Sequence, residues 1–275
     1  MEREFHRRLV AESDKQKRKQ LYAHFYSELT VFFRQHDHGK TSFGSFTPEL
    51  MHLLAPFVRG TVVLDYGCGY GVAAFELAKH ASRVIAVDVS ELMIEEVRRR
   101  VAQQRVANID PVCLGDRPEA ALEIRDGTVD VVYSNDVVEH LHPDDMRDHL
   151  ALAGRLLRPG GLYVCITPNR VTGPHDVSSQ FLPYHAKAEG AHIREYSHRE
   201  LCRAFCEAGF TRFRTPVTAI GYNRLRSDAA YRRLLVPPQW KFVLEEAWFA
   251  RAKKHRPKWL NLFCINKVIL FAWKP

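Results

Sequence analysis

The spacing of apolar side chains changes near residue 61, from helical intervals to short strand-like runs. Residues 1 to 35 predict a helix that lies against another part of the protein, because their apolar side chains recur at helical intervals. One such stripe consists of Leu21, Phe25, Leu29 and Phe32. A polar break follows at residues 36 to 45, and Thr47-Pro48-Glu49 is typical of the first turn of a second helix.

From residue 61 onward, Val- and Ile-rich runs alternate with helical segments such as residues 91 to 104. These runs are TVVLD, RVIAVD, DPVCLGD, TVDVVYSN and GLYVCITPN, followed later by TRFRTPVTAI and NKVILFAWK. Strands that alternate with helices of this length favour a parallel sheet covered on both faces. The sequence therefore predicts an α/β fold with a doubly wound, seven-stranded, mostly parallel sheet.

The chain divides into four predicted parts. Residues 1–45 form an N-terminal helical lid, and residues 46–219 form the α/β core. Residues 220–262 are a basic, aromatic helical insert, and residues 263–275 supply the final strand of the core sheet.

Composition narrows the class of protein. Hydrophobic residues make up 46% and charged residues 26% of the chain, which argues against a disordered or fibrous protein. No apolar run reaches the roughly 20 residues of a membrane-spanning helix, and the first residues do not resemble a secretory signal. The six cysteines form no CxxC pair, which argues against a disulfide framework or a zinc knuckle. We therefore expect a cytoplasmic protein.

The positive charge is concentrated near the C-terminus. From Tyr222 onward there are 12 Lys and Arg against 3 Asp and Glu, so this part accounts for the whole net charge of +8. All four tryptophans lie there as well. The insert could be an amphipathic cap that packs on the sheet, or a surface for anionic lipid at the inner membrane, nucleic acid or a protein partner.

The segment VLDYGCGYG, residues 63 to 71, contains the most informative motif. A strand brings Asp65 to its carboxyl end, and three alternate glycines then allow a tight turn that can approach a ligand. A dinucleotide fingerprint needs a small residue where Val72 stands, so that class of site is not indicated. Acidic residues also end the next two strands, at Asp88 and Asp116.

Together with LRPGG before the fifth strand, this DxGxGxG pattern resembles motif I of the class I S-adenosylmethionine-dependent methyltransferases. The resemblance covers residues 60 to 219 and the last strand. It is closest to the small-molecule type 11 branch that includes the ubiquinone-pathway O-methyltransferases, whose HL-type segment is similar to VEHL at residues 138–141.

The resemblance implies that S-adenosylmethionine is the cofactor. Gly67 and Gly69 would pack against its methionine part, and Asp65 would organise the loop that holds its ammonium group. Gly71 would be a further cofactor-binding residue of this loop. Asp88, followed by Val89, would bind the ribose hydroxyls, because a carboxylate accepts two hydrogen bonds well. Asp116 would contact the adenine, and Asn135 and Asp136 would line the cofactor from the fourth strand.

Methyl transfer to a hydroxyl requires a base, and histidine is the preferred one because its ordinary pKa is near ~6.5. His140, His175 and His192 are the candidates, each of which could instead line the substrate or be structural. Asp136, Glu139 and His140 also resemble the D/E-x-x-E-H arrangement thought to hold a divalent ion such as Mg²⁺ in the ubiquinone-pathway enzymes. Pro143, Asp144 and Asp145 suit the first turn of the next helix and need no catalytic role.

We therefore expect O-methylation of a small or amphiphilic, lipid- or sugar-linked, hydroxylated substrate by in-line transfer. The alternatives are N- or C-methylation of a small metabolite or RNA, or a regulator that binds the cofactor without turnover. SNDV follows the fourth strand where DNA amino-methylating enzymes carry (D/N/S)PP(Y/F), so nucleic acid is disfavoured. The sequence makes no prediction of the oligomeric state.

Overall fold

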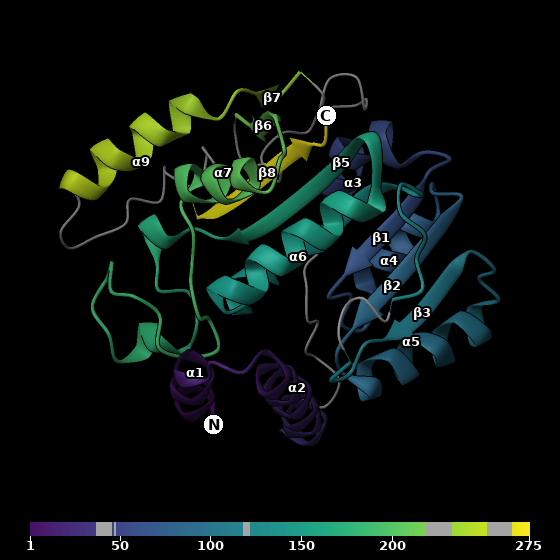
Figure 1. The fold of residues 1–275 in the computed structure, drawn as a ribbon, viewed down its shortest axis with the longest axis horizontal. Helices are drawn as coiled ribbons and strands as arrows, with labels where there is room; N and C mark the ends of the chain where they lie inside the picture. Colours follow the sequence, from purple (N-terminus) through teal and green to yellow (C-terminus); the bar gives the residue numbers. More distant parts are fainter. Residues whose placement is uncertain (37–45, 47, 118–121, 218–232, 252–265) are drawn as a thin grey trace.

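The computed structural model describes residues 1–36, 46, 48–117, 122–217, 233–251 and 266–275. Its described strands form one sheet in the order β3-β2-β1-β4-β5-β8-β6-β7 (Figure 1). Their bounds are β1 Val62–Tyr66, β2 Arg83–Asp88, β3 Ile109–Cys113, β4 Val129–Asn135, β5 Leu157–Pro168, β6 Arg212–Pro216, β7 Leu235–Val236 and β8 Lys267–Trp273.

The sheet is mostly parallel, as predicted. Strands β1 to β5 run in one direction, whereas β8 is antiparallel to both β5 and β6. The predicted count of seven strands is one too low, because the two-residue β7 pairs with the edge of β6. So short a strand carries no periodic signal in the sequence. The strand order reverses between β1 and β4, and this is where open α/β sheets bind ligands.

Helices cover both faces of the sheet, which confirms the doubly wound architecture (Figure 1). One face carries α3 Pro48–Val58, α4 Val72–Ala78 and α5 Glu91–Gln104, and the other carries α6 Pro143–Leu156 and α7 His198–Glu207. In α5, the buried Met93, Ile94 and Val97 recur at helical spacing against the sheet. Ser197 and Glu200 form a capping box at the start of α7, as their spacing predicts.

The N-terminal segment forms two helices, α1 Glu2–Ala11 and α2 Lys15–His36, so the prediction of one continuous helix is wrong. The break occurs because Asp14 caps α2: its Oδ1 accepts a hydrogen bond from the backbone N–H of Lys17, at 2.9 Å. Both helices bury apolar side chains in a small separate core, in which the rings of Phe5 and Phe25 stack 3.9 Å apart.

Three short 3₁₀ segments, η2 Val138–His140, η3 Arg170–Thr172 and η4 Val177–Gln180, lie in the loops that follow β4 and β5. Of the predicted insert, β7 and helix α9 Gln239–Arg251 are described, whereas most of its basic residues and Trp259 lie outside the described residues. Among the described helices, none combines the length and apolar character needed to cross a bilayer.

Candidate active site

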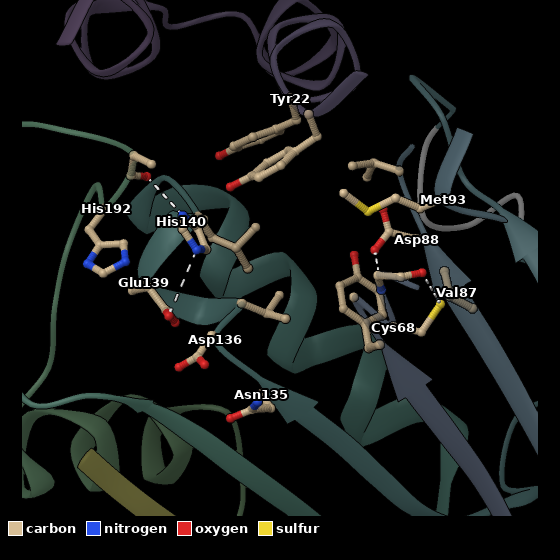
Figure 2. A pocket seen from close by; sticks show the side chains of 18 of the residues that line it. Tyr22, Cys68, Val87, Asp88, Met93, Asn135, Asp136, Glu139, His140 and His192 are labelled. Carbon is tan, nitrogen blue, oxygen red and sulfur yellow. Dashed lines mark hydrogen bonds and ion pairs between the residues drawn. The ribbon is translucent and has the colours of Figure 1, made fainter. Parts of the chain in front are cut away.

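A cavity of about 670 Å³ lies at the carboxyl ends of β1, β2 and β4, beneath α1 and α2. Eleven of the predicted site residues line it: Asp65, Gly67, Gly69, Asp88, Val89, Asn135, Asp136, Glu139, His140, His175 and His192. Figure 2 shows Asp88 on one side of this cavity and His140 and His192 on the other, with Asn135 at the end of β4 between them. The sheet thus brings both predicted halves of the site into one space.

The glycine loop between β1 and α4 is built around left-handed backbone. Gly67, Gly69 and Gly71 all have positive φ angles, between 53° and 76°. The N–H groups of Gly67 and Cys68 donate to the carbonyl oxygen of Val87 on β2, at 2.8 and 2.9 Å. Gly71 does not line the cavity; it is the N-cap residue of α4, so its role is to turn the chain.

Gly67 is expected to be the least replaceable glycine of this loop. A Cβ atom there would lie 2.4 Å from Cγ2 of Val137, in addition to the strain of a φ of +73°. We expect Gly67→Ala to weaken S-adenosylhomocysteine binding at least tenfold, measured by calorimetry. Gly60→Ala is the matched control, because Gly60 has a similar φ of +71° with nothing within 4 Å of the added atom. Equal losses in both variants would show that backbone strain alone matters.

The Asp88 carboxylate joins the glycine loop to the end of β2. Its Oδ2 accepts a hydrogen bond from the N–H of Gly69 and its Oδ1 one from the N–H of Ser90, both at 2.9 Å. Burial raises the pKa of Asp88, and these N–H donors oppose that rise. Each oxygen retains acceptor capacity toward the cavity, as a ligand with two neighbouring hydroxyls requires.

Asp65 is almost completely buried, and its Oδ2 has no hydrogen-bond partner among the described residues. Burial, followed by the charge of Asp88, raises the pKa of Asp65 to about 7. A buried carboxyl oxygen without a donor is costly, so a cationic or hydrogen-bonding ligand group would stabilise it. Tyr133 also lines the cavity, and no described residue forms a hydrogen bond with its buried hydroxyl.

Asp116 does not line this cavity, contrary to the predicted contact with adenine. Its side chain is exposed and borders a neighbouring shallower cavity between α2 and α5. Leu114, Gly115 and Arg117 line the main cavity at this strand end. The carboxylate is displaced because the chain turns at Gly115, whose φ is +58°.

The three predicted metal ligands do not converge. Asp136 has a left-handed backbone, with a φ of 55°, and both of its carboxylate oxygens accept hydrogen bonds from Nζ of Lys267, at 3.0 and 2.8 Å. Lys267, the first residue of β8, had no predicted role, since only the antiparallel pairing of β8 with β5 brings it here. Asp136 is therefore the ion-pair partner of Lys267. The residue that lies beside Glu139 and His140 is instead His192, and one nitrogen or oxygen atom of each of these three side chains lies within 4.8 Å of the others.

The histidines surround the cavity on the side of β4 and β5. Nδ1 of His140 lies 3.0 Å from the carbonyl oxygen of Ala191, and its ring stacks edge-on against those of His192 and Tyr26. Burial, then the charge of His192, lowers the pKa of His140 to about 3. His140 is consequently neutral and a weak base.

Glu139 is completely buried beside these rings. Its Oε2 accepts a hydrogen bond from the hydroxyl of Thr167, at 2.8 Å, whereas its Oε1 has no hydrogen-bond partner among the described residues. Burial, followed by the charge of Asp136, raises the pKa of Glu139 to about 8. At neutral pH this carboxyl can keep its proton and donate a hydrogen bond to a ligand.

The N-terminal helices cover the cavity. Figure 2 shows Tyr22 of α2 facing it, and Tyr26 of the same helix also lines it. Asp145 lies in the first turn of α6, as predicted, and its side chain is buried. It pairs with Arg18 through two hydrogen bonds of 2.7 and 2.8 Å, and it also accepts one from the hydroxyl of Tyr22. This buried contact fixes α2 across the cavity.

Comparisons with known proteins agree with this architecture. A family model described as a methyltransferase domain matches residues 63–161. A probable S-adenosylmethionine-dependent methyltransferase of Mycolicibacterium smegmatis is 34% identical over 67% of this chain and 61% of its own length. A ubiquinone biosynthesis O-methyltransferase of Caulobacter vibrioides is 34% identical over 42% of this chain and 44% of its own length. These alignments therefore span less than two thirds of either relative.

A solved structure with the same fold superimposes on nearly the whole of this chain. The [4+2]-cyclase SpnF superimposes with a TM-score of 0.57 over 94% of this chain and 96% of its own, at 16% identity. That likeness establishes the fold alone. With the glycine loop, Asp65 and Asp88 lining one cavity, and with the matched methyltransferase domain, the chain belongs to the class I S-adenosylmethionine-dependent methyltransferases.

Proposed function

We propose that this protein transfers a methyl group from S-adenosylmethionine to a hydroxyl group of a small acceptor, with a histidine as general base. The observation that carries the proposal is that Asp65 and Asp88 share one cavity with His140, His175 and His192. Asp88 would bind the ribose hydroxyls of the cofactor. The Oδ2 atom of Asp65 would find its hydrogen-bond partner at the methionine end of the cofactor. The acceptor would lie on the histidine side.

S-adenosylmethionine, when bound, supplies a sulfonium methyl group that is already electrophilic. The acceptor oxygen forms the new O–CH₃ bond as the S–CH₃ bond breaks, and the electron pair of that bond stays on sulfur. The hydroxyl proton passes to a histidine nitrogen. The protein thus has to position the two reactants, exclude water and take up one proton.

A hydroxyl acceptor is favoured because a hydroxyl proton must be removed, and three histidines face the cavity. The O-methyltransferase relative supports the same choice. A divalent ion has less support, since Asp136 is engaged by Lys267. We therefore assign the histidines to proton removal and expect activity to survive a chelator.

The acceptor is proposed to be small. The cavity volume of about 670 Å³ must hold both the cofactor and the acceptor, and pockets of ~300–1,000 Å³ ordinarily hold ligands of drug size. A lipid-linked acceptor would have to extend past α1 and α2. The basic aromatic surface that motivated a membrane contact lies mostly outside the described residues, so we do not extend the proposal to it.

The proposal predicts label transfer from S-adenosylmethionine carrying a tritiated methyl group to the small-molecule fraction of a host extract. Alanine variants of His140, His175 and His192, tested one at a time, should include one that loses roughly 100-fold in rate, the usual contribution of a general base. That variant should still bind S-adenosylhomocysteine. Normal cofactor binding without any labelled product would instead support a binding protein of this fold without methyl transfer.

A further inference from the structure

Glu195 lies between two of the candidate histidines. Its Oε1 accepts hydrogen bonds from the backbone N–H of His175 and pairs with Nδ1 of His192, both at 2.7 Å. Its Oε2 lies 3.1 Å from Nδ1 of His175. Glu195 is buried, and its hydrogen bonds from His175 and His192 overcome the opposing effect of burial and lower its pKa to about 2. It is therefore an ionised carboxylate that accepts hydrogen bonds from both rings.

The surrounding chain leaves space for this carboxylate. A Cβ atom on Gly173 would lie 2.1 Å from Oε2 of Glu195, so only glycine permits the approach. A second carboxylate, Asp176, accepts hydrogen bonds from the N–H groups of Gly190 and His192, at 2.9 and 3.1 Å. Two acids thus bind the segment after β5 to the segment before α7 and fix the backbone of His192.

The three histidines differ in which ring nitrogens remain available. His175 uses both, since its Nε2 lies 3.1 Å from the hydroxyl of Thr172. Nδ1 of His140 lies against the carbonyl oxygen of Ala191, its Nε2 lies 3.9 Å from Oε1 of Glu139, and burial makes it a weak base. His192 has its Nδ1 on Glu195, and within the described part of the chain no hydrogen bond engages its Nε2. Its ring lines the cavity beside Glu139 and His140 (Figure 2).

We propose that Glu195 is a positioning residue that holds His192 with its proton on Nδ1 and its bare Nε2 toward the acceptor, which makes His192 the base. This inference rests on the proposed methyl transfer. A carboxylate behind an imidazole selects one tautomer and fixes the orientation of the ring. The acceptor proton moves to Nε2 of His192 as the O–CH₃ bond forms, and it leaves to solvent after product release.

Nitrogen-15 NMR of histidine-labelled protein tests the tautomer without an acceptor. Burial lowers the pKa of His192, but its hydrogen bond with Glu195, together with the charges of the nearby carboxylates, outweighs that effect and raises the pKa above the ordinary histidine value near ~6.5. The measurement is therefore made at the alkaline end of a pH titration, where the nitrogen shifts no longer change and the rings are neutral. The wild-type protein should show His192 with a protonated Nδ1 and a bare Nε2. Glu195→Ala removes both acceptor oxygens, so we expect His192 to lose that tautomer and the methylation rate to fall by roughly 100-fold.

Glu195→Gln should separate positioning from folding. In the wild-type protein Oε1 accepts hydrogen bonds from the backbone N–H of His175 and from Nδ1 of His192. We therefore expect the amide oxygen of the variant to take the position of Oε1, and the amide nitrogen to take that of Oε2, beside Nδ1 of His175. The tautomer of His192 should then be retained, with most of the activity, while His175 changes to a bare Nδ1. Thr172→Val is a control that alters the partner of His175 and should leave the tautomer of His192 unchanged.

A proton on Nε2 of His192 in the wild-type protein would overturn the proposal, as would an unaltered tautomer in Glu195→Ala. Loss of rate in Glu195→Gln with the tautomer of His192 intact would also contradict it, because the charge rather than the orientation would then matter. These results are distinct from failure of the proposed function. If the protein binds no S-adenosylhomocysteine, the tautomer experiment still reports whether Glu195 orients His192.

Discussion

Asp88→Ala is expected to weaken S-adenosylhomocysteine binding by roughly 100-fold. The carboxylate is proposed to accept two ribose hydrogen bonds, and each bond to a charged acceptor contributes about 1.5–3 kcal/mol. Losing both removes about 3 kcal/mol, and about 1.4 kcal/mol corresponds to a factor of ten in Kd. The N–H groups of Gly69 and Ser90 also lose their partner, so the loop that faces the methionine part is less well fixed. Isothermal calorimetry measures the change.

Asp116→Ala is the matched control for this experiment. Asp88 ends β2 and Asp116 follows the adjacent strand β3, but only Asp88 lines the cavity. We expect Asp116→Ala to change the affinity less than about threefold, well below the change at Asp88. Asp88→Asn keeps the size of the side chain and should remain folded, which thermal unfolding can verify. Comparable losses of affinity in Asp88→Ala and Asp116→Ala would contradict the ribose assignment and would indicate that Asp116 contributes to the cofactor site.

The core could be predicted from sequence because its signals are local. Alternating Val/Ile runs and helical segments gave the seven longer strands, and parallel strands necessarily place Asp65 and Asp88 at one edge. Asp116 was misplaced because its position depends on the turn at Gly115, where one residue of difference moves a side chain out of the cavity. A strand-end pattern predicts the edge of the sheet, but it does not predict the direction of each side chain.

The histidine side of the site depends on contacts that no short pattern contains. Glu195 meets His175 across 20 residues of irregular chain, where neither helical nor strand periodicity restricts the path. Lys267 reaches Asp136 from 131 residues away, and the family resemblance gave no reason to expect a cation there. For that reason the residues of the cluster were largely predicted, whereas their pairing was not.

Arg18→Met is expected to loosen the N-terminal helices far more than a comparable change on their surface. Arg18 and Asp145 are both buried, and removing one partner of a buried ion pair typically costs about 3–5 kcal/mol because the other charge stays behind. Asp145 also accepts a hydrogen bond from Tyr22, which in turn accepts one from the backbone N–H of His142 at 2.7 Å. Loss of Arg18 therefore weakens the whole contact between α2 and α6.

Hydrogen exchange of the amides in α1 and α2 measures this effect directly, because local opening of the helices need not unfold the core. A cost of about 3 kcal/mol corresponds to roughly 100-fold faster exchange. Lys15 on α2 and Asp148 on α6 supply a control, because they form an ion pair whose side chains are 49% and 46% exposed. Exposed pairs contribute little, so Lys15→Met should change exchange by less than about fivefold.

The double variant Arg18→Met, Asp145→Leu distinguishes an ion pair from simple packing. If the cost of the single variant arises from an uncompensated buried carboxylate, removing that carboxylate should restore much of the protection. Cofactor binding should likewise be weaker in Arg18→Met than in the double variant, because Tyr22 and Tyr26 reach the cavity only while α2 is held in place. Equal exchange in Arg18→Met and Lys15→Met would show that α2 is held by its apolar face, and the buried pair would then have no part in closing the site.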